Sequence, residues 1–545
     1  MIKNTLLFLV LIQTIVLSQN LDSLYNKLLG LKPKLNIKVK SVQTINTKPE
    51  KCGFGLIGEI KTHLKEFSLE QQQTIQQILS RPIMQTSLVS PSGFFRIHYD
   101  TTGNNKPEYD INELAVAFDS SYNYEVNILS YLAPPKDGSN GGDDKYDVYV
   151  EDLRGGDYGA TTSDESLGNN KHTSYINLDN SFSTNEGYNS FGISAAQVTA
   201  AHEFHHAIQI GNYIFNQSDT YYHELTSTAM EETVYDNVND YYAYIRSYFN
   251  TTSKSFTKQS GYNLALWNIY LHERFDGNTG DEIIKRSWEL MATPHNNSAA
   301  VAIAKSIEEF GYSFKSEFNK FGIWIYFTNN RTKENIYFEE AKNYPLLKST
   351  TTTTLEPTNM PLTIGSNPIS INYNRFLDNS EGLPDTLIAI LSNSDVNSTS
   401  SIDYKLTVAT NTFDGATEIN ENYFSKIEGN SVDYISDSYI VNNELASDFV
   451  ESTEIEYAYP QPFSYQSLLS IPTFTDISGK AQLNVYTSDM NLVYSDVKNI
   501  AHSGNIVVKW NGLNANNNKL ASGVYIYVTK ADDKIKKGKI VILNE

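Results

Sequence analysis

Cysteine, positive charge and long apolar runs are all scarce in this chain of 545 residues. Its single cysteine, Cys52, excludes a framework of disulfides within the chain. Only 42 lysines and arginines stand against 63 acids, which gives a formal net charge of −21 and argues against nucleic acid or an anionic membrane as a partner. Beyond the N-terminus, no apolar run approaches the roughly 18 residues of a membrane span, so we expect none in the mature protein.

The N-terminus has the pattern of a secretory signal. Lys3 lies in a short basic head, residues 6–17 are nearly all apolar, and Ser18-Gln19 offers a cleavage site. The apolar run is too short for a comfortable membrane span. We therefore predict a signal peptide over residues 1–18 and a protein that is secreted or held at the cell surface.

The most informative stretch is Ala201–Ala207, which contains the pattern His-Glu-x-x-His at His202, Glu203 and His206. Residues four apart lie on one face of an α-helix, so the two imidazoles can bind one ion from the same side. Glu203 lies near enough to reach a water on that ion. This geometry predicts a zinc hydrolase in which His202 and His206 bind the metal and Glu203 is the catalytic general base.

The residues around the motif predict a buried helix. Ser194 and Gln197 match a capping box at its start, and Gly211 offers a left-handed stop at its end. Between them Glu203 is the only charged residue apart from the histidines, and an uncharged helix is normally buried. His205 points to the other side of His202, so we expect it to pack or to support a ligand rather than to bind the metal.

Two histidines require a third protein ligand. The metzincin continuation is excluded because Gln209 and Asn212 occupy the places of its glycine and histidine. A helical run over residues 221–232 carries Glu224 and Glu231 two turns apart on one face, and a turn before it allows an antiparallel return past the first helix. We predict Glu224 as the third ligand, with Glu231 in reserve and His223 as a weaker candidate.

These motifs resemble the gluzincin group of zinc metallopeptidases. The stretch Thr199–Gln209 and the later Glu224 to Glu232 are similar to a family of secreted bacterial metalloproteases, and the likeness spans about residues 88–345. The resemblance implies a zincin-like α+β catalytic domain over 88–345. It also implies zinc held by His202, His206 and Glu224, with Glu203 as the base. Many gluzincins place an acid four residues after the third ligand; here that residue is Thr228, so Glu231 or another group must orient a histidine.

The segment before this domain, residues 19–87, is predicted to be a pro-segment. It contains a lysine-rich stretch over 32–51, then Cys52, then a helical stretch over 63–79. One interpretation of Cys52 is a thiolate that caps the zinc until cleavage, loosely similar to the cysteine switch of matrix metalloproteases. The other interpretation is an ordinary small buried residue.

Residues 88–193 are expected to form the sheet of the catalytic domain. Residues 94–99, 146–150 and 173–178 have strand patterns, and the last is expected to be the edge strand that pairs with an extended peptide substrate. Asp110 is predicted to cap a helix that runs to about Leu132. The acids in the loop 138–144 could hold Ca²⁺, but their spacing is not that of an EF-hand and favours a solvated turn.

Residues 212–345 are expected to be helical. Aromatic residues recur there at intervals of three and four, around Trp267, Trp288 and Trp324. This spacing is typical of a helical core rather than of a cofactor site.

The C-terminal part is predicted to consist of all-β domains. Residues 346–361 form a threonine-rich linker and residues 362–455 a β-rich domain without a recognisable site. Residues 456–545 resemble the immunoglobulin-like sorting domain of type IX secretion cargo, through motifs that begin at Tyr459, Trp510, Gly523 and Lys536. That family usually has asparagine where this chain has Gln461. The resemblance implies the type IX secretion machinery as a partner.

Together these patterns predict a secreted zinc endopeptidase that is made as a zymogen and cleaves protein or peptide substrates. A metalloaminopeptidase is an alternative, but it needs an acidic cluster for the substrate's free amine, and no motif for one is evident. A non-catalytic surface adhesin with an inactive zincin domain is the alternative from another class; the intact His-Glu-x-x-His motif argues against it.

Overall fold

The computed structural model describes most of the chain after residue 50, together with residues 21–30. The described ranges are 21–30, 51–153, 157–275, 277–333, 335–354, 360–378, 385–408, 424–428, 435–441, 458, 461–465, 468–473, 480–502, 506–531 and 534–544. The predicted signal peptide lies outside them, as does nearly all of the lysine-rich stretch. The chain divides into two compact units, residues 1–439 and 440–545. In the described part no helix is both long and apolar enough to cross a membrane.

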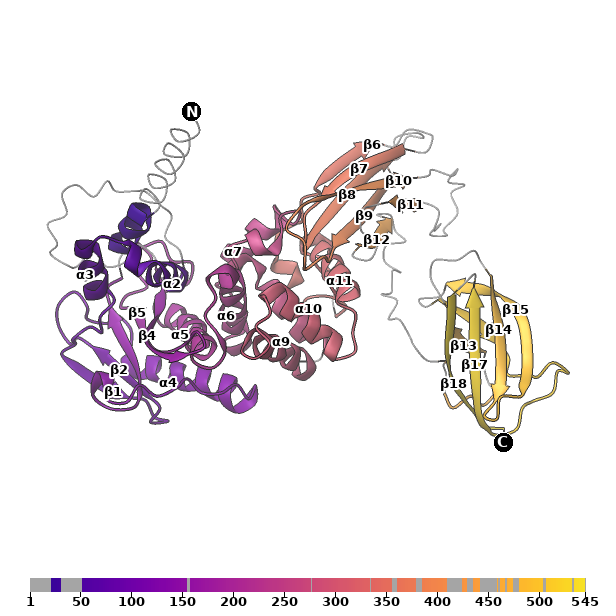
Figure 1. Cartoon of the computed structure of the whole chain (residues 1–545), viewed down its shortest axis with the longest axis horizontal. Coiled ribbons are helices and arrows are strands. Elements are labelled where there is room, and N and C mark those ends of the chain that lie inside the picture. Colours follow the sequence, from indigo (N-terminus) through magenta and orange to yellow (C-terminus); the bar gives the residue numbers. More distant parts are fainter. Residues whose placement is uncertain are drawn as a thin grey trace, which may run out of the picture. The chain divides into compact units, whose positions relative to one another are not determined.

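Strands between residues 86 and 179 form a five-stranded sheet (Figure 1). Its order is β1-β2-β3-β5-β4, with strands β1 Thr86–Val89, β2 Phe95–Tyr99, β3 Tyr146–Glu151, β4 Gly159–Gly168 and β5 Lys171–Asp179. Strands β2, β3 and β5 are parallel, whereas β1 and β4 are antiparallel to their neighbours. The three strands expected from the sequence are present.

The expected edge strand, however, is wrong: residues 173–178 lie in β5, inside the sheet, and the edge strand is β4. Strand β4 was not predicted because its small and polar residues do not alternate with apolar ones. Only its first half is buried, and its second half projects into solvent. A turn at Asn169 and Asn170, both with positive φ, joins β4 to β5.

Helix α5, Gly192–Ile208, crosses the sheet and carries the His-Glu-x-x-His motif. It begins earlier than predicted, at an N-cap residue Phe191 that makes no side-chain cap, so the Ser194 capping box is wrong. Gly211 is not a left-handed stop either, since it lies in a π-helical turn, Gln209–Tyr213, that continues α5. Glycine is needed there for close packing: a Cβ would lie 2.4 Å from Cδ of Pro135.

Helices account for the rest of the domain predicted over residues 88–345. Helix α4, Ile111–Tyr122, is capped by Asp110 as predicted and continues as a π-helix to Ile128, short of the expected end at Leu132. The others are α6 Thr220–Val234, α7 Tyr242–Phe249, α8 Leu266–Arg274, α9 Asn278–Met291, α10 Ala299–Glu309 and α11 Phe314–Tyr326. The predicted helical core is confirmed, since Trp267, Trp288 and Trp324 are all buried.

The N-terminal segment is helical and has a small core of its own. Residues 21–30 are helical, and they are followed after residue 50 by α2 Phe54–Thr62 and α3 Leu69–Ile78. The core is formed by residues of these helices, by Phe67 between α2 and α3, and by Ala160 of β4; its members are Leu24, Leu28, Ile57, Ile60, Phe67, Ile75, Ile78 and Ala160. Just before α2, residues 51–53 run alongside the start of β4, which places Cys52 in front of the sheet edge.

The β-rich region after α11 forms two sheets. Their orders are β12-β9-β8-β6 and β11-β10-β7, with β6 Thr351–Thr354, β7 Met360–Ser366, β8 Ser370–Asp378, β9 Asp385–Asn393, β10 Ile402–Val408, β11 Phe424–Glu428 and β12 Ile435–Val441. The threonines expected in a linker form β6, parallel to β8. Ile371 and Ile390 pack on α11 at Gly322, where a Cβ would lie 3.1 Å from Ile390. The linker prediction failed because β-branched threonines also suit a strand.

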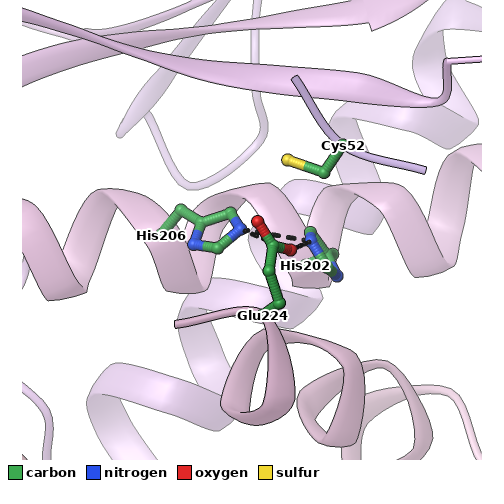
Figure 2. A group of neighbouring side chains, drawn as sticks. All are labelled: Cys52, His202, His206 and Glu224. Carbon is green, nitrogen blue, oxygen red and sulfur yellow. Dashed lines mark hydrogen bonds and ion pairs between the residues drawn. The ribbon is translucent and has the colours of Figure 1, made fainter. Parts of the chain in front are cut away.

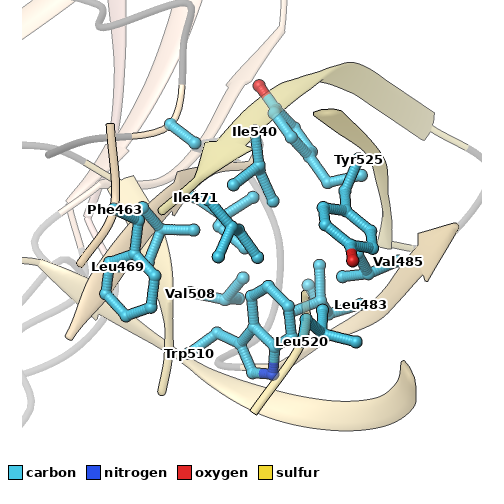
Figure 3. Packing of buried hydrophobic residues seen from close by; sticks show 14 of the residues in the cluster. Phe463, Leu469, Ile471, Leu483, Val485, Val508, Trp510, Leu520, Tyr525 and Ile540 are labelled. Atoms are coloured by element: carbon cyan, nitrogen blue, oxygen red, sulfur yellow. The ribbon is translucent and has the colours of Figure 1, made fainter. Parts of the chain in front are cut away.

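The second unit is a small β-sandwich (Figure 3). Its strands are β13 Leu469–Pro472, β14 Lys480–Thr487, β15 Leu492–His502, β16 Ile506–Trp510, β17 Gly523–Ala531 and β18 Lys534–Ile542. Strand β15 pairs with β14 over most of its length and with β16 at its end, so it links the two layers. Between the layers lie Leu483, Val485, Val508 and Trp510. The side chain of Gln461 ties the segment before β13 to β18 by accepting from the N–H of Val541 and donating to the carbonyl of Lys539.

Candidate metal centre

Two neighbouring helices bring three predicted ligands to one point. Helix α5 presents His202 and His206 one turn apart, and α6 returns beside it with Glu224 facing both rings (Figure 2). Oε2 of Glu224 lies 3.2 Å from Nε2 of His202 and 3.4 Å from Nε2 of His206. The two Nε2 atoms are 3.2 Å apart. The structure thus places His202, His206 and Glu224 around a common centre.

Each imidazole is held in this orientation through its other nitrogen. Nδ1 of His202 lies 2.7 Å from Oε1 of Glu231, and Nδ1 of His206 lies 2.9 Å from Oε1 of Gln209. A hydrogen bond at Nδ1 directs Nε2 toward the metal position and fixes the tautomer. Glu231 therefore hydrogen-bonds His202 from behind and is not one of the three residues around the centre. It can orient the imidazole, which is the role that the sequence left to Glu231 or another group because Thr228 stands four residues after Glu224.

The remaining histidines of these helices face elsewhere. Nδ1 of His223 lies 2.8 Å from Oε1 of Gln209, and Nδ1 of His205 lies 2.8 Å from Oε2 of Glu125. Burial raises the pKa of Glu125 well above its ordinary value and lowers the pKa of His205 well below its own. The pair is therefore neutral and packs on the far side of α5, as expected for His205.

Cys52 supplies a fourth donor that comes from a distant part of the sequence. Its Sγ and the ligand atoms of His202, His206 and Glu224 all lie within 4.8 Å of one another, and all four residues are buried. Backbone pairing with the sheet edge holds the thiol there: the N–H of Gly53 donates to the carbonyl of Gly159 over 3.0 Å. The next ring along the chain, Phe54, stacks on His206 with centroids 4.0 Å apart.

The donor set fits a divalent metal ion. Apart from the two imidazoles, the buried oxygens of Glu224 meet no hydrogen-bond donor among the described residues. Burial alone would lower the pKa of His202, but Glu224 and Glu231 raise it to about 9, so the metal-free cluster takes up a proton. Burial, Glu203 and Glu224 raise the pKa of the Cys52 thiol well above its usual value. Two nitrogens, one oxygen and one sulfur form a typical zinc set.

Glu203 lies beside the cluster with one free oxygen. Its Oε2 accepts a hydrogen bond of 2.7 Å from the hydroxyl of Thr161 on β4, whereas its buried Oε1 has no partner in the described part of the chain. Gly159 makes room for it, since a Cβ there would lie 3.0 Å from Cγ of Glu203. Neither Thr161 nor Gly159 was found from the sequence, because β4 itself was missed.

A glycine in the loop before α8 packs closely against Glu224. Gly261 has φ +94°, and a Cβ on it would lie 2.6 Å from Cβ of Glu224 and 2.4 Å from the carbonyl oxygen of Tyr221. No other residue fits this conformation and this space. Gly261 therefore fixes the position of Glu224 from outside α6.

The loop 138–144 has its acids paired with basic side chains. Asp143 accepts from Arg96 and Lys145, and Asp144 accepts from Lys136. Side-chain hydrogen bonds with Arg96 and Lys145 lower the pKa of Asp143 below its ordinary value, although its partial burial opposes them. These pairings match the solvated turn favoured by the sequence over a calcium site.

Comparison with known proteins adds little to this geometry. No protein-family model matches the chain, and no curated protein does. Among solved structures it is similar to PorZ, described as an essential bacterial surface component of the type-IX secretion system of Porphyromonas gingivalis, at 16% identity and a TM-score of 0.14, over 32% of this chain and 23% of PorZ. It is also similar to latent dimeric PorU of Porphyromonas gingivalis, at 10% identity and a TM-score of 0.14, over 34% of this chain and 20% of PorU. The chain thus spans less than a quarter of the length of either protein.

Proposed function

We propose that this chain is the latent precursor of a secreted zinc endopeptidase. The observation that carries the proposal is the meeting of His202, His206 and Glu224 at one buried point, with the unpartnered Oε1 of Glu203 beside it. Two imidazoles and a glutamate form the donor set of a catalytic zinc site when a fourth position is open to water or substrate. In this chain Cys52 faces that fourth position.

The chemistry divides between the metal and the protein. Zinc held by His202, His206 and Glu224 would supply the Lewis acidity that acidifies a water and polarises a peptide carbonyl. Glu203 accepts the proton of the attacking water at Oε1 and passes it to the nitrogen of the leaving amine. The hydroxyl of Thr161 keeps the other carboxylate oxygen hydrogen-bonded and so leaves Oε1 as the acceptor.

The edge strand β4 provides a place for an extended substrate. Residues 51–53 already pair with its start, through Tyr158 N–H to the carbonyl of Lys51 at 2.9 Å and Gly53 N–H to that of Gly159 at 3.0 Å. A substrate that added a strand there would use the same backbone groups. Residues 51–54 therefore occupy the substrate's place as well as the fourth metal position, which makes the full chain latent until this segment is removed.

Support for export comes from both ends of the chain. The N-terminal sequence has the pattern of a secretory signal, and the second unit is a β-sandwich, as the resemblance to type IX sorting domains implies. On this proposal the C-terminal unit is the address for type IX secretion, and the mature enzyme acts outside the cell or at its surface.

Casein hydrolysis with and without a chelator tests the proposal. We expect processed wild-type protein to cleave casein in a chelator-sensitive way, and Glu203→Gln to lower the rate by ~10³-fold while zinc stays bound. Glu125→Gln is the matched control, since Glu125 is an equally buried glutamate that serves His205 instead of the metal cluster.

Three other results would each require a different account. Full activity in Glu203→Gln would discard the mechanism. Release of N-terminal residues alone would favour an aminopeptidase. A processed protein that binds zinc but cleaves nothing would favour a surface adhesin.

A further inference from the structure

Lys51, the residue before Cys52, has one of the most enclosed charged side chains in the described part of the chain. Its side chain is 1% exposed. Its Nζ donates to Oε2 of Glu231 and to Oδ2 of Asp240, each over 2.5 Å. Two carboxylates at hydrogen-bonding distance from the same nitrogen make this a buried ion pair.

Two aromatic rings face this ammonium, and two hydroxyls hold its partner Asp240. Nζ lies 4.9 Å from the ring centre of Tyr158 and 5.0 Å from that of Tyr244, within the range of cation–π attraction. The second oxygen of Asp240 accepts from the hydroxyls of Tyr158, at 2.8 Å, and Ser190, at 2.6 Å. We call Glu231, Asp240, Tyr158 and Tyr244 the lysine socket.

The lysine socket adjoins the metal cluster. Glu231 takes the ammonium on Oε2 while its Oε1 lies 2.7 Å from Nδ1 of His202. The backbone of Lys51 pairs with Tyr158 at the start of the sheet edge, and the next residue, Cys52, faces the metal position. A peptide lying along the same edge would thus bring a side chain into the socket one residue away from the atom that faces the metal.

The basic groups that face the socket are Lys51 and, at Oε1 of Glu231, the imidazole of His202. Among the described residues, Lys51 is the sole lysine or arginine that pairs with Glu231 or Asp240. Both acids are buried: burial alone would raise the pKa of Asp240, and Lys51 lowers it below its ordinary value. When residues 51–54 leave, Asp240 loses its cation and Glu231 keeps only its contact with His202, and a buried charge that has lost its partner is destabilising. A second ammonium of the same shape restores the balance.

From these contacts we infer that the lysine socket is a specificity site, which selects peptide substrates with a lysine beside the scissile bond, and that Lys51 occupies it as a substitute for that residue. The inference rests on the proposed endopeptidase function. It names the substrate class for the same site. Glu231 both contacts His202 and forms part of the socket. Among the described residues Asp240 contacts no proposed metal ligand, so it belongs to the socket alone.

Cleavage of a matched peptide set by the processed protein tests the inference. The processed form is obtained by limited proteolysis of the full chain and identified by its N-terminal sequence. The peptides are blocked at both ends and differ at one position beside the scissile bond, which holds lysine, arginine, norleucine or glutamate. We expect kcat/KM for lysine to exceed that for norleucine, its uncharged near-isostere, by ~10-fold or more, because a buried polar site rejects an apolar analogue.

Substitution at Asp240 sharpens the test. Asp240→Asn should lower the lysine-to-norleucine ratio by ~10-fold, whereas Asp236→Asn, an exposed acid four residues earlier, should leave it unchanged. The wild-type profile decides the matter even if Asp240→Asn does not fold. Cleavage without a preference for lysine would overturn the inference and leave the endopeptidase in place.

Two further outcomes separate the inference from the proposed function. Cleavage that requires a free N-terminus and ignores lysine would make Glu231 and Asp240 the holders of a terminal amine, and would overturn the lysine assignment. Absence of cleavage from every peptide and from casein would overturn the endopeptidase itself, and the socket would then be a clamp for the N-terminal segment.

Discussion

Replacing Glu231 by glutamine tests how the cluster holds its metal. Glu231 uses both carboxylate oxygens: Oε1 lies 2.7 Å from Nδ1 of His202, and Oε2 accepts from Nζ of Lys51 over 2.5 Å. Glutamine has one acceptor oxygen and an amide nitrogen that only donates. It can therefore accept a hydrogen bond from only one of these two donors, and its amide nitrogen then faces the other donor.

The expected loss follows from these contacts. Groups that orient a metal-binding histidine typically contribute 10–100-fold in metal affinity, or about 1.4–2.7 kcal/mol. Both partners here are almost fully buried, with side chains 1% exposed, so solvent cannot replace the bond. We expect Glu231→Gln to raise the Kd for zinc by 10–100-fold, measured on the full chain by competition with a chromophoric chelator.

Glu125→Gln is the matched control for this measurement. Glu125 makes a similar bond, 2.8 Å, to Nδ1 of His205 on the same helix, but that ring faces away from the cluster. The control should leave the Kd for zinc within about twofold of wild type. An unchanged Kd in Glu231→Gln, or an equal loss in both variants, would refute the assignment of Glu231 as the group that orients His202.

Three further predictions follow from other contacts. Cys52→Ala should raise the casein-cleaving rate of the unprocessed chain by ~10-fold or more, because the segment loses its donor to the metal; an unchanged rate would make Cys52 a packing residue. Gly261→Ala should lower the free energy of unfolding by about 2–4 kcal/mol, because alanine disfavours the positive φ and its Cβ would clash with Glu224. Gly93→Ala is the control: its φ is +79° but the space around it is open, so the free energy of unfolding should fall by only about 1–2 kcal/mol. Burial and the negative charge of the neighbouring Glu339 raise the pKa of Glu273 to about 7, although the hydrogen bond that the backbone N–H of Glu339 donates to this carboxyl lowers it. A carboxyl with a raised pKa in the folded state stabilises the fold at a pH below its unfolded pKa, and this stabilisation is lost as the pH rises through 7. In denaturation measurements the free energy of unfolding should be on the order of 2–3 kcal/mol lower at pH 8 than at pH 4.5 because of this group, and Glu273→Gln should abolish that difference.

The parts of the site that follow from local spacing could be predicted from the sequence. His202, Glu203 and His206 are placed by the pitch of one helix, and Glu224 by the length of the turn that returns the next helix beside it. The aromatic helices after α6 were evident for the same reason, since their period is local.

The parts that depend on distant pairing could not be found in this way. Lys51 meets Glu231 across 180 residues and Asp240 across 189, and no local pattern signals either contact. The edge strand β4 was missed because its exposed half has no apolar alternation, and with it the roles of Thr161 and Gly159. Ser194 and Gly211 are residue types that suit helix ends, but α5 begins at Gly192 and continues as a π-helical turn through Gly211, which packs closely against Pro135.

Zinc-edge X-ray absorption on the full chain tests the proposed metal centre. We expect one zinc per chain, with two imidazoles, one carboxylate and one sulfur as its neighbours, and loss of the sulfur alone in Cys52→Ala. A chain that retains no zinc, or whose zinc spectrum is the same in Glu224→Ala and His202→Ala as in wild type, would contradict it.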